Sequence, residues 1–206
     1  MKRYFVFTLI VALAVSVSQV AHAQANKEAN KLALEGAEAS KNQDWDKAVE
    51  LLRKATALDR KYAPNLAAVY QLRGYAAANN QQFPNAISDY SEALKITPED
   101  ARIYEQRAAV EMKLNDNDKA LADYSEAIKL KPNEARYYLY RSYIYETKGD
   151  LKNSMADTDK VLKLDPKNKE AKARKDRLLA REAMKAPFTP IPAPPPKTSP
   201  AATHRP

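Results

Sequence analysis

Apolar side chains recur at intervals of three and four residues from about residue 26 to residue 186, and no stretch alternates apolar and polar residues. The first pattern is typical of amphipathic helices and the second would indicate strands, so we expect helix throughout this region. Within residues 67–100 the pattern predicts one helix at about 67–80 and a second at about 84–96. Polar breakers separate the helices of each pair: Lys41-Asn42-Gln43-Asp44, Asn79-Asn80-Gln81-Gln82, Asn115-Asp116-Asn117 and Lys148-Gly149-Asp150.

The helical pattern is itself repeated with a period of 34 residues. Pro98, Pro132 and Pro166 close three gapless copies, 67–100, 101–134 and 135–168, and a longer copy, 29–66, has Arg60 in place of the closing proline. Such a period predicts one helical hairpin stacked on copies of itself. Small residues recur in columns where paired helices must approach closely. These columns are Gly36, Gly74, Ala108, Ser142; Ala48, Ala86, Ala120, Ser154; and Ala55, Ala93, Ala127, Val161.

The columns resemble those of the tetratricopeptide repeat family, whose large–small–aromatic–alanine–aromatic–alanine–proline order is met nearly in full by 67–100 and 101–134. The resemblance covers about 155 residues. It implies an all-α fold, a right-handed α-solenoid of about four helix-turn-helix units (29–66, 67–100, 101–134 and 135–168) with a basic capping helix at 169–186. The outer units depart from the pattern, as terminal units do when one side has no neighbour.

Residues 1–23 are typical of a secretory signal peptide. Lys2 and Arg3 precede an apolar stretch from Tyr4 to Val17, and Ala21-His22-Ala23 provides a small-x-small cleavage site. We expect cleavage after Ala23, a short lead at 24–28, and a protein that is periplasmic or secreted. An uncleaved anchor is the alternative, but the apolar stretch is shorter than the roughly 20 residues of a spanning helix.

The last segment, 187–206, contains eight of the thirteen prolines of the chain. Proline fixes φ and removes a backbone donor, so we expect an extended, disordered tail. The run Pro192-Ala193-Pro194-Pro195-Pro196-Lys197 fits the pattern that polyproline-binding domains recognise. A solvated spacer is the interpretation that composition favours.

Composition excludes most catalytic chemistry. The chain has no cysteine, its histidines are His22 and His204, and its three glycines cannot form a phosphate-binding loop. Carboxylates alternate with lysines at helical spacing, which is typical of solvated helix faces. We therefore expect no enzyme, no cofactor and no metal. An enzyme would need a site made of carboxylates alone, and no pair of them stands out.

The resemblance to tetratricopeptide repeats implies a concave groove lined by the first helix of each unit, where a protein or peptide partner would bind. The inward positions are Gln71, Tyr75, Arg102, Gln106, Ala109, Arg136, Tyr140 and Tyr143. Tyrosine and arginine are enriched at binding hot spots, although these tyrosines are also compatible with simple packing. Some family members hold the C-terminal carboxylate of heat-shock chaperones with lysines and asparagines, but the corresponding residues here, Ala33 and Ala37 or Gln71 and Tyr75, cannot supply that clamp.

A second set of columns pairs arginines with aspartates. Each arginine of the first helices lies sixteen residues before an aspartate of the second helix of the same unit: Arg73 and Asp89, Arg107 and Asp123, Arg141 and Asp157. Antiparallel helices of this length would bring the members of each pair together. We expect three structural ion pairs.

The net charge of +8 is concentrated near the end of the chain, because residues 167–186 carry eight basic and three acidic side chains. The repeats are therefore nearly neutral, and we expect no nucleic-acid partner. Two functions follow. The first is a non-catalytic adaptor that binds through the groove. The alternative is attachment to an anionic membrane or cell-wall polymer through the basic helix, by Lys169, Lys172, Arg174, Lys175, Arg177 and Arg181.

Overall fold

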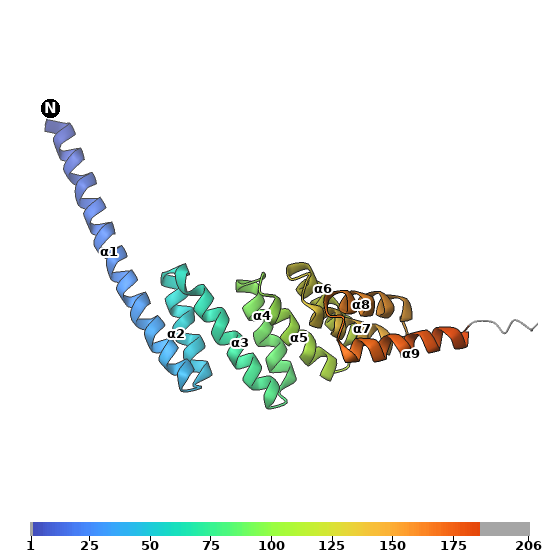
Figure 1. Cartoon of the computed structure of the whole chain (residues 1–206). Helices are drawn as coiled ribbons and strands as arrows, with labels where there is room; N and C mark the ends of the chain where they lie inside the picture. Colours follow the sequence, from blue (N-terminus) through green and yellow to red (C-terminus); the bar gives the residue numbers. More distant parts are fainter. Residues whose placement is uncertain (1, 186–206) are drawn as a thin grey trace, which may run out of the picture.

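The chain forms an all-α solenoid. The computed structural model describes residues 2–185, and within them the backbone forms nine α-helices, one short 3-10 turn and no strand. The predicted tail at 187–206 and the last residue of the predicted cap, 186, lie outside the described residues. The helices stand side by side along one direction, each packed on the helix before and after it (Figure 1). They are α1 (Lys2–Lys41), α2 (Trp45–Leu58), the 3-10 turn η1 (Arg60–Tyr62), α3 (Ala63–Asn79), α4 (Phe83–Ile96), α5 (Ala101–Lys113), α6 (Asn117–Leu130), α7 (Ala135–Thr147), α8 (Leu151–Leu164) and α9 (Lys169–Lys185).

The first helix is much longer than the others and its N-terminal part projects beyond the stack (Figure 1). The residues of α1 that the structure describes as buried, Ala29, Ala33, Gly36 and Ala39, lie in the part that packs on α2. The residues of the predicted leader from Lys2 onward belong to this same helix. In the described part of the chain, no helix combines the length and the apolar character that a bilayer crossing requires.

The tight turns inside the four helical pairs share one backbone device. Gln43, Gln81, Asn115 and Gly149 each adopt a positive φ, of 59°, 60°, 59° and 79°. Each of these residues lies in one of the polar breakers identified in the sequence. A left-handed residue reverses the chain within a few residues, and only Gly149 adopts that conformation without steric cost. Between units the turns carry the exposed prolines, and Asp100 closes one of them by accepting a hydrogen bond from the Arg102 backbone N–H at 3.0 Å.

The four additional residues of the first unit become an extra helical turn. The sequence predicts that the first helix of unit 67–100 begins near residue 67, but α3 begins at Ala63 and has 17 residues, against 13 in α5 and in α7. Pro64 lies in its first turn, where the missing N–H costs nothing, and Leu66 is buried on the core side. The insertion therefore lengthens one helix and leaves the loops short.

The core is built from the columns of small and large residues. Ala48, Ala86 and Ala120, like Ala55, Ala93 and Ala127, are fully buried where the helices cross. Leu52, Tyr90 and Tyr124 fill the space between them, each about 1% exposed. The last unit places hydroxyl groups in these columns and satisfies them: Ser154 Oγ donates to the Ser142 carbonyl at 2.8 Å, and Thr158 Oγ1 donates to the Ser154 carbonyl at 2.7 Å.

A candidate interaction surface on the first helices

One face of the stack consists of the outward sides of α3, α5 and α7, which we call the first-helix face. It carries three tyrosines that the sequence predicts to lie in the groove: Tyr75, Tyr140 and Tyr143, which are 54%, 41% and 48% exposed. The two predicted arginines, Arg102 and Arg136, are also exposed, and Gln71 and Gln106 are half-buried. The structure therefore leaves all three of these aromatic rings accessible to a partner.

Polar contacts between successive first helices hold this face together. Gln71 Nε2 on α3 donates to Gln106 Oε1 on α5 at 2.6 Å, and Arg136 Nε on α7 lies 3.0 Å from Glu105 Oε1 on α5. Burial raises the pKa of Glu105, and the Arg136 guanidinium opposes this shift. These contacts fix the lateral spacing of the helices and thus the spacing of the exposed tyrosines.

The ring of Tyr140 has a rigid support. It stacks on the buried ring of Tyr124 in α6, with ring centroids 5.6 Å apart. Burial raises the pKa of the Tyr124 phenol, so this group stays neutral. Tyr140 therefore offers one ring face that is already positioned.

The sequence-based prediction of this surface did not include Leu72, which is 49% exposed. It precedes Gln106 by 34 residues and Tyr140 by 68, so it occupies the same column of the repeat. Extending that column by one unit would have found it. With Leu72 included, the column changes from apolar to amide to aromatic along the stack.

All three arginines of the predicted Arg–Asp pairs form bidentate hydrogen bonds with their aspartates. Arg73 Nε and Nη2 donate to Asp89 Oδ2 and Oδ1 at 2.9 and 2.6 Å, and Arg107 makes the same bonds to Asp123 at 2.7 and 2.8 Å. Arg141 bonds Asp157 at 2.8 Å through both nitrogens. The aspartates are nearly fully buried, and their hydrogen bonds raise the pKa of each arginine. Each pair joins the two helices of one unit, away from the first-helix face.

The basic capping helix differs from its sequence prediction at Arg174. That residue was expected to face outward but is only 1% exposed, and it lies between α9 and the last unit. Its Nη1 donates to the Leu139 carbonyl at 3.0 Å and to Ser142 Oγ at 2.9 Å, while Nε lies 3.1 Å from Glu146 Oε2. Arg174 therefore cannot contact an external anionic surface.

Three other basic residues of this set have acidic neighbours. Lys175 lies 2.7 Å from Asp159, and Arg177 and Arg181 lie 3.4 and 3.8 Å from Glu146. Lys169 and Lys172 are exposed on α9. The sequence of residues 169–184 predicts that five apolar side chains face the last unit: Ala171, Ala173, Leu178, Leu179 and Ala183. Ala171 and Leu178 are buried, whereas the other three are exposed. The prediction was wrong for these three because burying Arg174 turns their side of the helix outward.

The sequence comparison with known families gives one match. A sequence model of the tetratricopeptide repeat matches residues 34–101 and 106–169, which is more than half of the chain. The chain belongs to the tetratricopeptide repeat family. No curated protein matches this tetratricopeptide repeat chain significantly in sequence.

Solved structures with the same fold include other tetratricopeptide repeat proteins. The tetratricopeptide domain of Arabidopsis OM64 is 30% identical, with a TM-score of 0.53, and the match covers 56% of this chain and 96% of that domain. A tetratricopeptide repeat protein from Parabacteroides merdae is 21% identical, with a TM-score of 0.60, covering 77% of this chain and 61% of that one. The first such domain of Spaghetti (RPAP3), described as bound to the HSP90 peptide SRMEEVD, is 22% identical with a TM-score of 0.54, covering 57% and 93%.

Proposed function

We propose that this protein is a non-catalytic adaptor that binds an extended peptide or a partner's helix on the first-helix face. The observation that carries the proposal is the set of three exposed tyrosines, Tyr75, Tyr140 and Tyr143, on the same side of first helices. Large, stiff amphipathic rings lose little conformational entropy on binding and form the centres of many protein interfaces. Leu72 adds an apolar contact on α3.

The charges of this face favour a contact through tyrosine rather than a clamp for a free carboxylate. The RPAP3 domain is described as holding a peptide that ends in Glu-Glu-Val-Asp. Here Arg102 Nη2 lies 3.2 Å from Asp100 and Arg136 lies 3.0 Å from Glu105, so both cations already have carboxylate partners. We infer a partner whose apolar and aromatic side chains supply most of the contact.

We also propose that the protein acts after export, in the periplasm or outside the cell. The support is the sequence of residues 1–23, with its basic start, apolar stretch and Ala21-His22-Ala23 site. Among the residues of α1 whose burial the structure describes, the buried ones begin at Ala29, so cleavage after Ala23 removes none of these. Partners would then belong to an exported or envelope-associated set.

The experiment is a comparison of captured partners. The chain is cross-linked in its native envelope beside a variant that combines Tyr75→Ala, Arg102→Ala, Arg136→Ala and Tyr140→Ala, and the captured proteins are identified. We expect the variant to lose the wild-type partners while its circular dichroism is unchanged. A matched variant on exposed positions of the second helices, Lys95→Ala with Lys129→Ala, should retain them. Identical capture by all three forms would refute the first-helix face as the site.

Salt distinguishes this function from attachment through α9. A contact built on tyrosines persists as ionic strength rises, because it depends mainly on buried apolar area. Attachment of Lys169 and Lys172 to an anionic polymer would instead fall away with salt. If high salt releases both the wild-type protein and the quadruple variant from the envelope to the same extent, the surface-attachment alternative is favoured.

A further inference from the structure

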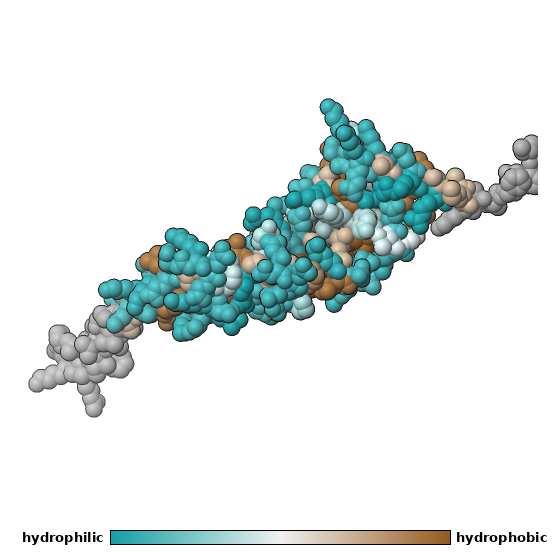
Figure 2. All heavy atoms as spheres, turned by 90° about the horizontal axis from the view of Figure 1, so that it is seen from below, coloured by the Kyte–Doolittle hydropathy of each residue, from teal (hydrophilic) through white to brown (hydrophobic). Residues whose placement is uncertain are grey.

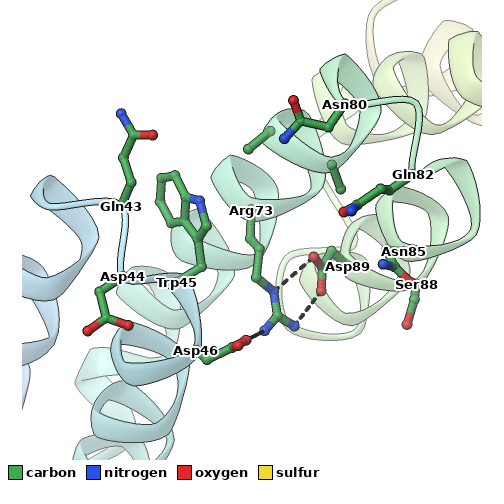
Figure 3. Close-up of a pocket in the computed structure, with 12 residues that line it drawn as sticks. Gln43, Asp44, Trp45, Asp46, Arg73, Asn80, Gln82, Asn85, Ser88 and Asp89 are labelled. Carbon is green, nitrogen blue, oxygen red and sulfur yellow. Dashed lines mark hydrogen bonds and ion pairs between the residues drawn. The ribbon is translucent and has the colours of Figure 1, made fainter.

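A polar notch lies between the N-terminal end of α2, the C-terminal half of α3 and the first turns of α4. It has a volume of about 530 Å³, which falls in the usual range of about 300–1,000 Å³ for small-molecule sites. Figure 3 shows the side chains of Trp45, Arg73 and Asp89 following one another across the notch, from left to right. The amide side chains of Asn80, Gln82 and Asn85 lie on the far side. Trp45 is half-buried, so part of its indole ring remains accessible.

This notch is on the other side of α3 from the first-helix face. Arg73 and Tyr75 are two residues apart on the same helix, which separates their directions by about 200°. Ala76, Ala77 and Asn80, which also line the notch, share the side of Arg73. A ligand here and a partner on the first-helix face would therefore occupy separate surfaces.

The repeat columns explain why this unit has space at that point. Ala77 is followed 34 and 68 residues later by Glu111 and Tyr145, which are far larger. Glu111 is buried at its position, 3% exposed, and the ring of Tyr145 lies 5.8 Å from the guanidinium of Arg141. In the unit of the notch the small methyl group of Ala77 leaves the corresponding volume open.

The same unit leaves one guanidinium donor without a buried partner. Arg107 Nη1 and Arg141 Nη1 donate to the hydroxyls of Ser91 and Ser125, at 2.9 and 3.0 Å. The residue at the corresponding position of the first unit is Arg53, whose Nε donates instead to Tyr70 Oη at 2.7 Å. Arg73 Nη1 donates to Asp46 at 2.8 Å, and the Asp46 side chain is 95% exposed. An ion pair to so exposed a carboxylate contributes little to stability, so a ligand oxygen can replace Asp46 at little cost.

The chemistry of the lining selects among ligand classes. One arginine and three aspartates, Asp44, Asp46 and Asp89, give the notch a net negative charge, which disfavours an anion. A cation would pair with the carboxylates, but it cannot accept a hydrogen bond from the amide N–H groups or from Arg73 Nη1 in place of Asp46. Hydroxyl groups both donate and accept, and so match this mixture of carboxylates, amides and guanidinium. The indole of Trp45 adds an apolar platform beside them.

We propose that this notch binds a small neutral carbohydrate. A sugar ring places its C–H face on the indole of Trp45, and its hydroxyls bond Arg73 Nη1 and the amides of Asn80, Gln82 and Asn85. The arrangement gives the protein a second binding surface, independent of the first-helix face, that recognises sugars outside the cell or on its envelope.

The chain itself supplies the probe, because Trp45 is its only tryptophan. Tryptophan-selective fluorescence of the full-length protein is titrated with glucose, galactose, mannose and N-acetylglucosamine, and separately with lysine amide and sodium acetate. We expect at least one sugar to produce a saturable change that the two ions do not. The affinity for that sugar should fall at least tenfold in Ala77→Tyr, which fills the notch as Tyr145 does in its own unit.

Two further variants keep the test decisive. Asn80→Ala with Gln82→Ala changes only exposed side chains, so the fold is retained and the affinity should still fall. Tyr75→Ala, on the opposite side of α3, should leave sugar binding unchanged even where it removes a protein partner. The proposal is overturned by the absence of a saturable change with any of the four sugars, or by a response to lysine amide or acetate in their place.

Discussion

The carboxyl group of Glu111 is 3% exposed, and its Oε2 atom has no hydrogen-bond partner among the described residues. Burial raises its pKa to about 7, the nearby Asp123 carboxylate adds to the shift, and Arg107 opposes it. The folded chain therefore binds this proton more tightly than the unfolded chain, in which the pKa is near 4.5. Stability associated with Glu111 is present below about pH 4.5 and is lost as pH rises toward about 7.

We predict that Glu111→Gln removes this pH dependence. Above pH 7 the variant should be more stable than the wild type by about 1–3 kcal/mol, because the amide does not ionise, and the difference should shrink toward pH 4.5. Urea unfolding at several pH values measures it. Glu99→Gln, at an exposed position, is the control and should follow the wild type. A constant difference across the pH range would contradict the assignment.

The Arg–Asp pairs allow a second prediction at the residue scale. Asp123 is 5% exposed, so Arg107→Ala leaves an unpaired buried carboxylate and should cost about 3 kcal/mol of unfolding free energy. Arg102→Ala removes an exposed partner of Asp100 and should cost less than about 1 kcal/mol. Denaturant unfolding of both variants gives the comparison. Equal losses would mean that the buried pair contributes no more than a surface pair.

At the scale of the helix, α9 is held by a buried arginine as well as by apolar contacts. Arg174 bonds the Leu139 carbonyl and Ser142 Oγ, and it lies beside Glu146, which also faces Arg177 and Arg181. Ser142 makes this possible. Earlier units have glycine or alanine at this position, whereas the hydroxyl of Ser142 can accept a hydrogen bond from Arg174. The helix is therefore attached to the last unit through this polar cluster in addition to the apolar contacts of Ala171 and Leu178.

We predict that Arg174→Met detaches α9 without unfolding the repeats. Methionine keeps an apolar stem of similar length but removes the guanidinium that donates to the Leu139 carbonyl and to Ser142 Oγ and that pairs with Glu146. Backbone amides of α9 should exchange with solvent faster by tenfold or more, while those of α4 to α6 are unchanged. Lys172→Ala, an exposed position on the same helix, should leave α9 protected. Unchanged exchange in Arg174→Met would show that Ala171 and Leu178 alone hold the helix.

The helices were predictable because they follow from repeated columns, whereas the orientation of α9 was not. The repeated columns place small residues where the two helices of a unit approach closely, as Gly74 does beside Asp89 and Tyr90, so the pairing of α3 with α4 or α5 with α6 needs no further information. Residues 169–185 have no second copy to compare with. An arginine among lysines in such a helix is expected to face water, and only the acceptors on Leu139, Ser142 and Glu146 reveal that Arg174 does not. The notch could not be predicted for a related reason, because it results from departures from two columns. Ala77 is smaller than Glu111 and Tyr145 in its column, and Arg53 stands where Ser91 and Ser125 offer a hydroxyl to the arginine.

Across the whole molecule the core has two parts that meet at α5. One cluster of buried residues extends from α1 to α5 and includes Ile103 and Val110, while the other extends from α5 to α9 and includes Ala101 and Ala108. Tyr104 packs against both clusters. Because each helix packs mainly on its neighbours, stability is close to a sum of local terms, and changes at one end affect the other end little.

Because stability is close to a sum of local terms, the unfolding free energy of shortened chains shows where the folded domain begins. Removing residues 1–23 leaves Ala29, Ala33, Gly36 and Ala39, so every described contact of α1 with α2 through a buried residue is retained. We predict that the shortened chain, beginning at Gln24, unfolds in urea within about 0.5 kcal/mol of the full chain, as expected for the loss of surface groups only.

The control is a chain shortened through residue 33, which loses the buried Ala29 and Ala33 and should be less stable, with the loss confined to α2 and α3 in hydrogen exchange. N-terminal sequencing of the exported protein tests the same boundary in the cell and should find Gln24. A loss of several kcal/mol on removing residues 1–23 would mean that this segment is part of the folded domain. In that case export with cleavage after Ala23 would destabilise the solenoid, and the proposal that the mature protein works outside the cytoplasm would have to be abandoned.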